Sequence, residues 1–249
     1  MIAATSTNLI GGGILALLAS GGLAFLAWRS RRILQAIEAT PTTPIGRIKL
    51  PGYYEVKGKV LCDNPLSTPG TGDPCVYYHL RITDEVQDVV HDSDGHHRTR
   101  NHTEVVEDKE ESCTFQLQDK TGTLGVLPTG ATFEGSEALK SREGRTDSAW
   151  KAERAAAMGR HAREHKGSRT TVTSIPVGRQ VYAIGAVQSL RNGLFLQRDE
   201  AEGRPFLVSV KSESELVDSY GRGATWTLAG AFGCLLLGLG LIVAGLVGR

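Results

Sequence analysis

Cysteine is scarce in this chain of 249 residues, and its pattern excludes the disulfide-rich class of small secreted domains. Only Cys62, Cys75, Cys113 and Cys234 are present, and Cys234 lies inside a long apolar stretch. Three cysteines remain for the polar part of the chain, and none belongs to a C-x-x-C motif. A Cys62–Cys75 bridge is conceivable, but the pattern favours free buried thiols in a reducing compartment.

The short motifs of several enzyme classes are also absent. The sequence contains no P-loop, no nucleophile elbow and no dinucleotide-binding glycine fingerprint. We therefore expect no cofactor and name no catalytic residue, and the sequence favours a non-enzymatic role.

Charge is missing from two long stretches, residues 9–28 and 226–247. Each is about as long as a helix that crosses roughly 30 Å of hydrocarbon. Residues 1–8 carry no Lys or Arg, so the first stretch is interpreted as an uncleaved anchor and not as a signal peptide. The two stretches predict an integral, two-pass membrane protein.

The basic residues beside the two spans predict an orientation. Arg29, Arg31 and Arg32 follow the first span directly, and nothing basic precedes it. Lys211 and Arg222 precede the second span, whereas only Arg249 follows it. Because Lys and Arg accumulate on the cytoplasmic side, we expect a cytoplasmic middle region with both termini outside.

Both spans contain small residues at four-residue spacing, which lets helices approach closely. These residues are Ala16, Ser20 and Ala24 in the first span and Ala229, Gly233, Gly240 and Ala244 in the second. The pattern indicates either that the two spans pack on each other or that the chain forms a homo-oligomer.

The region between the spans is predicted to be a mainly β (α+β) domain over residues 53–210. Tyr54, Val56, Gly58 and Val60 alternate with polar residues, as in a half-buried strand. Residues 29–52 are a juxtamembrane helix and linker, and residues 211–225 are a second juxtamembrane helix. We expect a barrel-like or sandwich-like β domain with one inserted helix at residues 149–165, flanked by the two transmembrane helices.

Several local signals define turns and helix ends. A charged hairpin is predicted from residues 85–90 to residues 99–110, and Asn192-Gly193 indicates a tight hairpin. Ser212 with Glu215 forms a capping-box pattern. Four glycines are interpreted as structural: Gly122 and Gly178 in turns with positive φ, and Gly58 and Gly185 at bulges or close backbone contacts.

Two histidine patterns are weak candidates for metal binding. His161, Glu164 and His165 match H-x-x-E-H, which on a helix brings both histidines to one face and leaves the glutamate as a base. His91, His96, His97 and His102 cluster near the predicted hairpin tip. The surroundings favour a solvated helix face and an exposed polar loop, so we expect no metal.

Opposite charges are concentrated in two segments. Residues 84–111 have a formal charge of −7, and residues 140–169 have a formal charge of +5. The basic segment either faces the acidic hairpin, contacts anionic lipid headgroups or is simply solvated. The candidate lipid-binding residues within it are Arg154, Arg160, Arg163 and Lys166, in addition to the arginines after the first span. Nucleic acid is not an expected partner, because Trp150 is the one aromatic residue of this segment.

The order of several short motifs resembles the GIDE family, also called the beside-a-membrane domain. The motifs are Gly58-Lys59-Val60, PCVYY at residues 74–78, FQLQDKTG at 115–122, VYAIG at 181–185 and PFLVS at 205–209. The resemblance implies a domain held against a membrane between two transmembrane helices. Eukaryotic members are best known as mitochondrial ubiquitin ligases with a RING zinc domain after the second span.

The sequence departs from that pattern where the RING would begin. It stops at Arg249, and its four cysteines cannot supply the ligands of two cross-braced zinc sites. The resemblance therefore implies a RING-less member, a membrane-anchored interaction or sensor module with an unknown protein partner. The alternatives are a ligase-related protein that uses a RING partner in trans and a zinc hydrolase that uses the H-x-x-E-H stretch.

Overall fold

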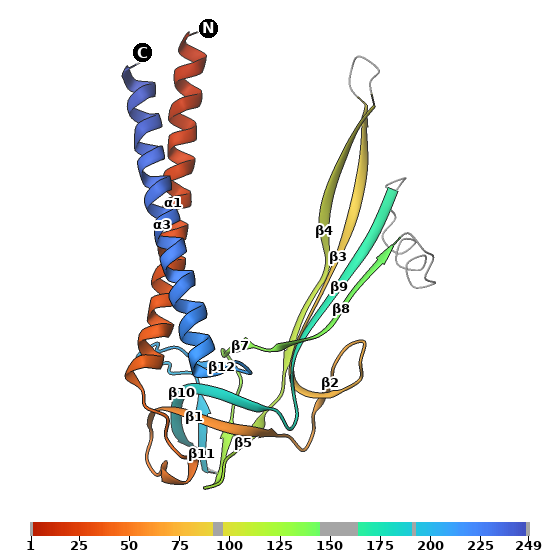
Figure 1. Ribbon diagram of the computed structural model, residues 1–249, viewed down its shortest axis with the longest axis vertical. Helices are drawn as coiled ribbons and strands as arrows, with labels where there is room; N and C mark the ends of the chain where they lie inside the picture. The colour runs from red at the N-terminus through yellow and green to blue at the C-terminus, as the bar shows by residue number, and fades with distance from the viewer. Residues whose placement is uncertain (1, 92–96, 145–163, 191–192, 248–249) are drawn as a thin grey trace.

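Two long helices stand side by side and carry both ends of the chain (Figure 1). The computed structural model describes residues 2–91, 97–144, 164–190 and 193–247. Helix α1 covers Ile2–Ala39 and helix α3 covers Glu213–Val247. Both are long and apolar enough to cross a membrane, with mean hydropathies of 2.1 and 2.4 in their most apolar windows. The expected spans are thus supported as candidate membrane helices, and each continues unbroken beyond its apolar stretch.

Small residues spaced seven apart form the contact between the helices. Gly13, Ser20 and Ala27 are buried on α1, and Ala224, Ala231, Gly238 and Gly245 are buried on α3. Ser20 Oγ donates a hydrogen bond of 2.8 Å to the carbonyl of Ala231. The two spans therefore pack on each other, but mainly through a different set of small residues from the one that the four-residue spacing indicated. Ser20 is shared, whereas Ala24, Ala229, Gly233, Gly240 and Ala244 are exposed on the outer faces.

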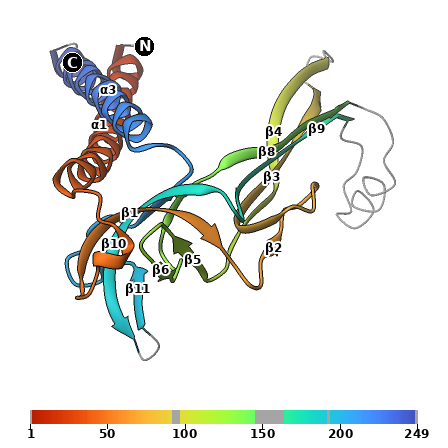
Figure 2. The ribbon, with the colours of Figure 1, turned by 60° about the horizontal axis from the view of Figure 1, so that its bottom comes forward.

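Five strands close into a small barrel below the helix pair (Figure 2). They are β1 (Gly52–Leu61), β5 (Phe115–Gln118), β6 (Thr123–Val126), β11 (Gly193–Gln197) and β10 (Gln180–Leu190). The barrel closes because β1 pairs with β5 on one edge and with β10 on the other. β10 also pairs with β12 (Leu207–Ser209), which in turn pairs with β7 (Thr132–Glu134). The mainly β prediction is confirmed in its barrel-like form.

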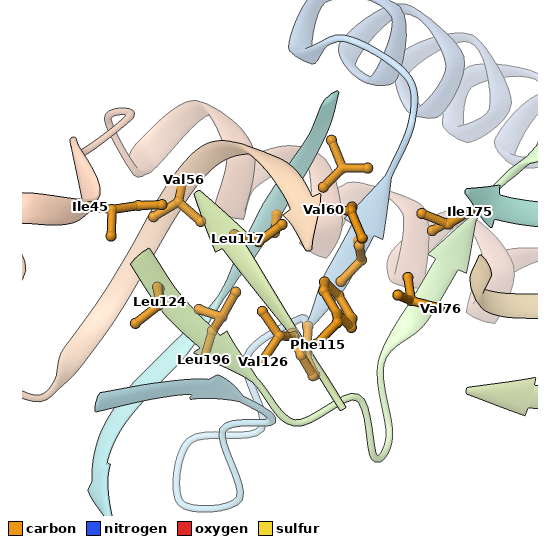
Figure 3. Packing of buried hydrophobic residues seen from close by; sticks show 14 of the residues in the cluster. Ile45, Val56, Val60, Val76, Phe115, Leu117, Leu124, Val126, Ile175 and Leu196 are labelled. Carbon is orange, nitrogen blue, oxygen red and sulfur yellow. The ribbon is translucent and has the colours of Figure 1, made fainter. Parts of the chain in front are cut away.

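Apolar side chains fill the interior of the barrel (Figure 3). In β5, Phe115 and Leu117 are buried while Gln116 and Gln118 are exposed, which is the alternation expected of a strand with one face on the core. Val56 and Val60 supply the same face of β1. The interior is therefore a packed core, and any binding surface lies on the outside of the barrel.

A second sheet extends from the barrel as a long wing. Its strands run in the order β4 (His97–Ser112), β3 (Pro74–His91), β9 (Glu164–Pro176) and β8 (Ser136–Gly144). The short strand β2 (Leu66–Ser67) pairs with the start of β3, and a 3-10 turn, η1 (Ile45–Arg47), precedes the barrel. The predicted charged hairpin is confirmed as β3 and β4. With 18 residues, β3 is about 60 Å long.

The prediction of a helix at residues 149–165 is wrong for its last two residues. Glu164 and His165 belong to β9 and pair with Gln87 and Val86 of β3. The pairing continues from there to Pro176, so a strand begins where the last residues of the helix were expected. Residues 145–163, which hold the rest of the expected helix, lie outside the described residues.

Replacing Gly238 with leucine should push the two spans apart. A Cβ atom at this position would lie 2.9 Å from the carbonyl oxygen of Gly13, a backbone atom that cannot move aside. We expect a loss of about 1–3 kcal/mol, measured as a lower midpoint of thermal unfolding in detergent. Gly233→Leu is the matched control, because a Cβ there meets nothing within 4 Å. Equal effects of the two substitutions would contradict the packing described here.

Candidate membrane-proximal interface

The C-terminal end of α1 and the N-terminal end of α3, here called the inner ends of the helices, pack against the outer wall of the barrel. Ile33 and Ile37 lie one turn apart on α1 and so share a face. They meet Leu216 of α3 and three barrel residues in a buried cluster, here called the anchor cluster. The barrel residues are Tyr182, Ile184 and Leu207. The anchor cluster therefore ties each helix to strands β10 and β12.

A fully buried carboxylate, that of Glu55, lies beside the anchor cluster. Glu55 Oε2 accepts a hydrogen bond of 2.7 Å from the hydroxyl of Tyr182, and Thr42 Oγ1 donates to Glu55 Oε1. The amide of Thr43 donates to the Glu55 carbonyl at 2.8 Å. Burial, and then the bond to Glu55, raises the pKa of Tyr182, so its hydroxyl stays a donor. Glu55 thus joins the linker after α1 to the wall of the barrel.

Ion pairs and a cap fix the start of α3. Ser212 N donates to Glu215 Oε2 at 2.7 Å, and Glu215 N donates to Ser212 Oγ at 3.3 Å, which confirms the predicted capping box. Lys57 of β1 forms a 2.7 Å ion pair with Glu213. On the other side, Lys211 lies 2.9 Å from Glu134 of β7. Residues of β1 and β7, together with the cap, therefore hold this helix end.

The loop between β11 and β12 docks on α1 just below the first span. Arg32 stacks over the ring of Trp28 at 4.9 Å and donates a 3.0 Å hydrogen bond to the carbonyl of Gly203. Arg204 lies over the ring of Tyr53 at 4.4 Å. Tryptophan and arginine are residues that anchor helices at the membrane–water interface. This loop therefore lies close to the predicted membrane surface.

Asp199 holds the same loop in shape. Its side chain is 5% exposed. Oδ2 accepts a 2.7 Å hydrogen bond from Arg204 Nε, and Oδ1 accepts one of 3.1 Å from the amide of Glu202. The bond from the Glu202 amide, and then that from Arg204, lowers the pKa of the Asp199 carboxyl. The carboxylate is therefore the form that the folded loop requires.

Two open grooves flank the interface. The larger, about 960 Å³, lies between β10 and the start of α3 and is here called the foot groove. Its charged lining residues are Lys57, Arg179, Lys211, Glu213, Glu215 and Asp218. The smaller, about 490 Å³, lies between α1 and Pro205 and is lined by Arg32 and Arg204. Both grooves combine charged rims with apolar surface, an arrangement suited to a protein segment or a lipid headgroup.

The predicted membrane-surface residues occupy different places. Arg29, Arg31 and Arg32 lie on α1 directly after the first span, with Arg29 and Arg31 exposed and Arg32 engaged as described. Lys166 lies in β9. Arg154, Arg160 and Arg163 lie outside the described residues, so contact of this basic segment with lipid stays a prediction.

The histidine patterns are only partly described. Glu164 and His165 lie in a strand, which excludes the helical geometry that the H-x-x-E-H interpretation required, and His161 lies outside the described residues. His91 and His97 are register partners at the end of the hairpin, whereas His96 is not described. His102 Nε2 lies 3.1 Å from Glu104 Oε1. In the described ranges, no three His, Cys, Asp or Glu side chains form a group that could hold a metal ion.

The four structural glycines differ in their roles. A Cβ at Gly58 would lie 3.1 Å from the carbonyl oxygen of Gln118, and one at Gly185 would lie 2.7 Å from Phe206, so both lie in close contacts as expected. Gly178 has a φ of 83°. Gly122, in contrast, lies in its turn without positive φ, because the Asp119 carboxylate shapes that turn by accepting from the amides of residues 121 and 122.

The wing rises on the same side of the barrel as the helix pair (Figure 1). Helix α1 has 38 residues and is about 57 Å long, so strand β3 reaches nearly as far as the helices do. The wing strands carry charged residues such as Asp84, Glu107 and Asp108, which cannot enter hydrocarbon without a large penalty. With the spans in a bilayer, the wing must therefore tilt away from the helix pair at its junction with the barrel.

These features define a class of protein: a β-barrel with a wing, whose two ends are fixed to a pair of candidate membrane helices. A family model, GIDE, described as E3 ubiquitin ligase, matches residues 86–244, which is more than half of the chain. The chain belongs to the GIDE family. No curated protein and no solved structure matches the chain. The matched range begins in β3, so β1 and the PCVYY motif precede it although β1 closes the barrel.

Sequence reasoning missed Glu55 and Asp199. In the alternating pattern of β1, Glu55 falls on the polar face, which sequence alone assigns to solvent. The linker after α1 and the side chain of Tyr182 cover that face. The sequence gives no sign of this contact, because Tyr182 lies 127 residues after Glu55 in the chain.

Removing the hydroxyl of Tyr182 should destabilise the barrel–helix junction. Tyr182→Phe leaves a buried carboxylate oxygen of Glu55 without its donor, at a cost of about 1–3 kcal/mol. Chemical unfolding followed by circular dichroism measures this loss. Tyr54→Phe is the control, because the Tyr54 hydroxyl donates to the Leu50 carbonyl in an exposed contact of 3.2 Å. A Tyr182→Phe variant as stable as the control would contradict the role of Glu55.

Acid should loosen the loop between β11 and β12. The pKa of Asp199 is lowered in the folded state, so its contribution is complete above the unfolded pKa, about 4, and is lost as the pH falls through the folded value. We expect the hydrogen-exchange protection factors of residues 199–204 to fall at low pH in the wild type. In Asp199→Asn they should be low already at neutral pH. Protection factors in Asp199→Asn equal to those of the wild type at neutral pH would contradict the role of the Asp199 carboxylate in holding this loop.

Proposed function

We propose that the chain is a membrane-anchored, non-enzymatic interaction or sensor module that works at the bilayer surface. The anchor cluster carries this proposal, since it packs the inner end of each candidate membrane helix on the barrel. A domain held at both ends in this way samples partners in the layer next to the membrane. Its membership of the GIDE family places it among ligase-related proteins, and the interaction role is our proposal within that family.

The foot groove is the proposed docking surface for a protein partner. Three basic residues and three acidic residues line it, and two of them, Lys57 and Glu213, form an ion pair with each other. Mixed charge on a groove with apolar walls favours a polypeptide segment that carries both signs over a uniformly charged polymer. The groove also adjoins the anchor cluster, so an occupant would contact α3 and the barrel together.

Anionic headgroups are the proposed second partner. Arg29 and Arg31 are exposed immediately beyond the span, and the basic segment contributes Arg154, Arg160, Arg163 and Lys166. Each basic residue near an anionic surface adds roughly 1 kcal/mol. Since the helices already fix the domain to the membrane, this attraction would set the orientation of the domain and not its location.

The family description favours one further candidate, a ligase-related role, and we propose that a RING partner in trans would take part in it. In that case the foot groove would receive the partner or its substrate. A ubiquitin-transfer assay with the full chain, with and without the captured partner, separates this candidate from a purely binding role.

The docking proposal is tested by photo-crosslinking in native membranes. A photoreactive residue at Asp218, which lines the foot groove, should give a discrete crosslinked partner. The same residue at Ser219, which is exposed on the neighbouring helix position but does not line the groove, is the matched control. Equal products at both positions, or none at Asp218, would contradict a docking site in this groove.

The lipid proposal is tested in nanodiscs that hold the full chain. Hydrogen exchange of residues 151–166 should be slower in discs with anionic lipid than in neutral discs. Reversing Arg154, Arg160, Arg163 and Lys166 to glutamate should abolish that difference. The control exchanges Arg and Lys at the same four positions and keeps the charge. A difference that survives charge reversal would exclude electrostatic contact with headgroups.

A further inference from the structure

Two thiols meet where the wing joins the barrel. Cys62 follows the end of β1, and Cys113 lies between the end of β4 and the start of β5. Their sulfur atoms are 3.7 Å apart, which is van der Waals contact, although 51 residues separate them along the chain. The chain between them contains the whole β3–β4 hairpin, so the pair stands at the points where this hairpin leaves and re-enters the barrel.

The surroundings of the two thiols differ. Both are partly buried against the barrel core. Cys62 Sγ lies 3.5 Å from the carbonyl of Thr114, and Cys113 Sγ lies 3.7 Å from the carbonyl of Val76. Burial, and then the contact with Cys62, raises the pKa of Cys113 to about 11, so Cys113 is protonated at neutral pH. The Cys62 sulfur makes the more exposed of these two contacts, so we expect Cys62 to react first.

The third cysteine nearby is not equivalent. Cys75 is fully buried within β3, in the part of the strand that pairs with β2 and β9. The structure places Cys62 beside Cys113 and not in a bridge with Cys75, and all three are free thiols. The sequence could not predict the contact between Cys62 and Cys113. The two residues meet because β1, which ends before Cys62, pairs with β5, which begins after Cys113.

We propose that Cys62 and Cys113 are an oxidisable pair that forms an intramolecular disulfide on reaction with a low-molecular-weight disulfide such as glutathione disulfide. Two thiols in contact, outside regular strands and partly exposed, carry the proposal. A disulfide needs its sulfurs about 2.05 Å apart. The sulfurs must therefore approach by less than the width of one atom, and both residues lie in connecting segments that can shift.

The reaction is an ordinary exchange of thiol and disulfide. Cys62 loses its proton and its sulfur attacks one sulfur of glutathione disulfide; the S–S bond breaks and one glutathione leaves as a thiol. The sulfur of Cys113 then attacks Cys62 Sγ in the mixed disulfide, loses its proton and releases the second glutathione. The protein is oxidised by two electrons, and one glutathione disulfide is reduced to two thiols.

The bond would act on the wing. It would tie the outgoing and returning segments of the β3–β4 hairpin to each other at the edge of the barrel, where the wing must tilt to avoid the bilayer. Oxidation would restrict that tilt, and reduction would release it. In a reducing cytoplasm the pair would be a reversible switch, since structural disulfides do not persist there.

The test uses the full chain in detergent, treated with glutathione disulfide, blocked with a thiol reagent, digested and mapped by mass spectrometry. The expected product joins the peptides that contain Cys62 and Cys113, and it disappears on reduction. Cys75→Ala is the matched control and should form the same product. Cys113→Ser should stop at a glutathione adduct on Cys62, and Cys113→Ala guards against an effect of the serine hydroxyl.

Three outcomes would overturn the proposal. They are a Cys62–Cys75 product, an adduct on Cys62 that persists in the wild type without resolution, and complete blocking of both thiols after oxidation. Hydrogen exchange supplies an independent readout. In the oxidised wild type, but not in oxidised Cys113→Ser, the segments around residues 62 and 113 should exchange more slowly than in the reduced protein.

Discussion

The contact between the inner ends of the helices and the barrel wall is the interaction on which the rest of the molecule depends. Ile33 and Ile37 from α1 and Leu216 from α3 reach the same patch of β10 and β12. Without this patch the helices would be joined to the barrel by linkers and by polar contacts such as the Arg32–Gly203 hydrogen bond and the Lys57–Glu213 ion pair. With it, each candidate span continues as an unbroken helix onto the domain, and a bilayer around the spans would fix the position of the barrel. The buried pair of Glu55 and Tyr182 reinforces the patch from the adjacent strand.

The wing adds a second constraint. A sheet about 60 Å long that carries charge along its strands must stay in water. With the candidate spans in a bilayer, the wing would start from a barrel held beside the membrane, so the angle at its root would decide whether it stays clear of the hydrocarbon. The root is also where Cys62 and Cys113 meet. The geometry thus concentrates any change of shape at one junction.

Local signals in the sequence were sufficient for local structure. The two apolar stretches, the capping box at Ser212, the charged hairpin and the pairing of β10 with β11 up to Gly193 were all predictable, because each depends on neighbouring residues. The family resemblance was readable from motifs in order. Features made by residues far apart were not. Three features depend on how distant segments meet. They are the pairing of β1 with β10, the burial of Glu55, and the contact between the two spans at Gly13 and Gly238.

Spin labelling of the full chain in nanodiscs tests the central claim most directly. The loop at Glu202 docks on α1 just below Trp28, whereas Lys120 lies in a turn beside η1, beyond the end of α1. If the anchor cluster holds the barrel at the bilayer surface, a paramagnetic reagent confined to the lipid headgroups should strongly broaden the spectrum of a spin label at residue 202. The same reagent should leave the spectrum of a label at residue 120 unchanged. Equal broadening at both positions, or none at residue 202, would show that the barrel is not held at the bilayer surface.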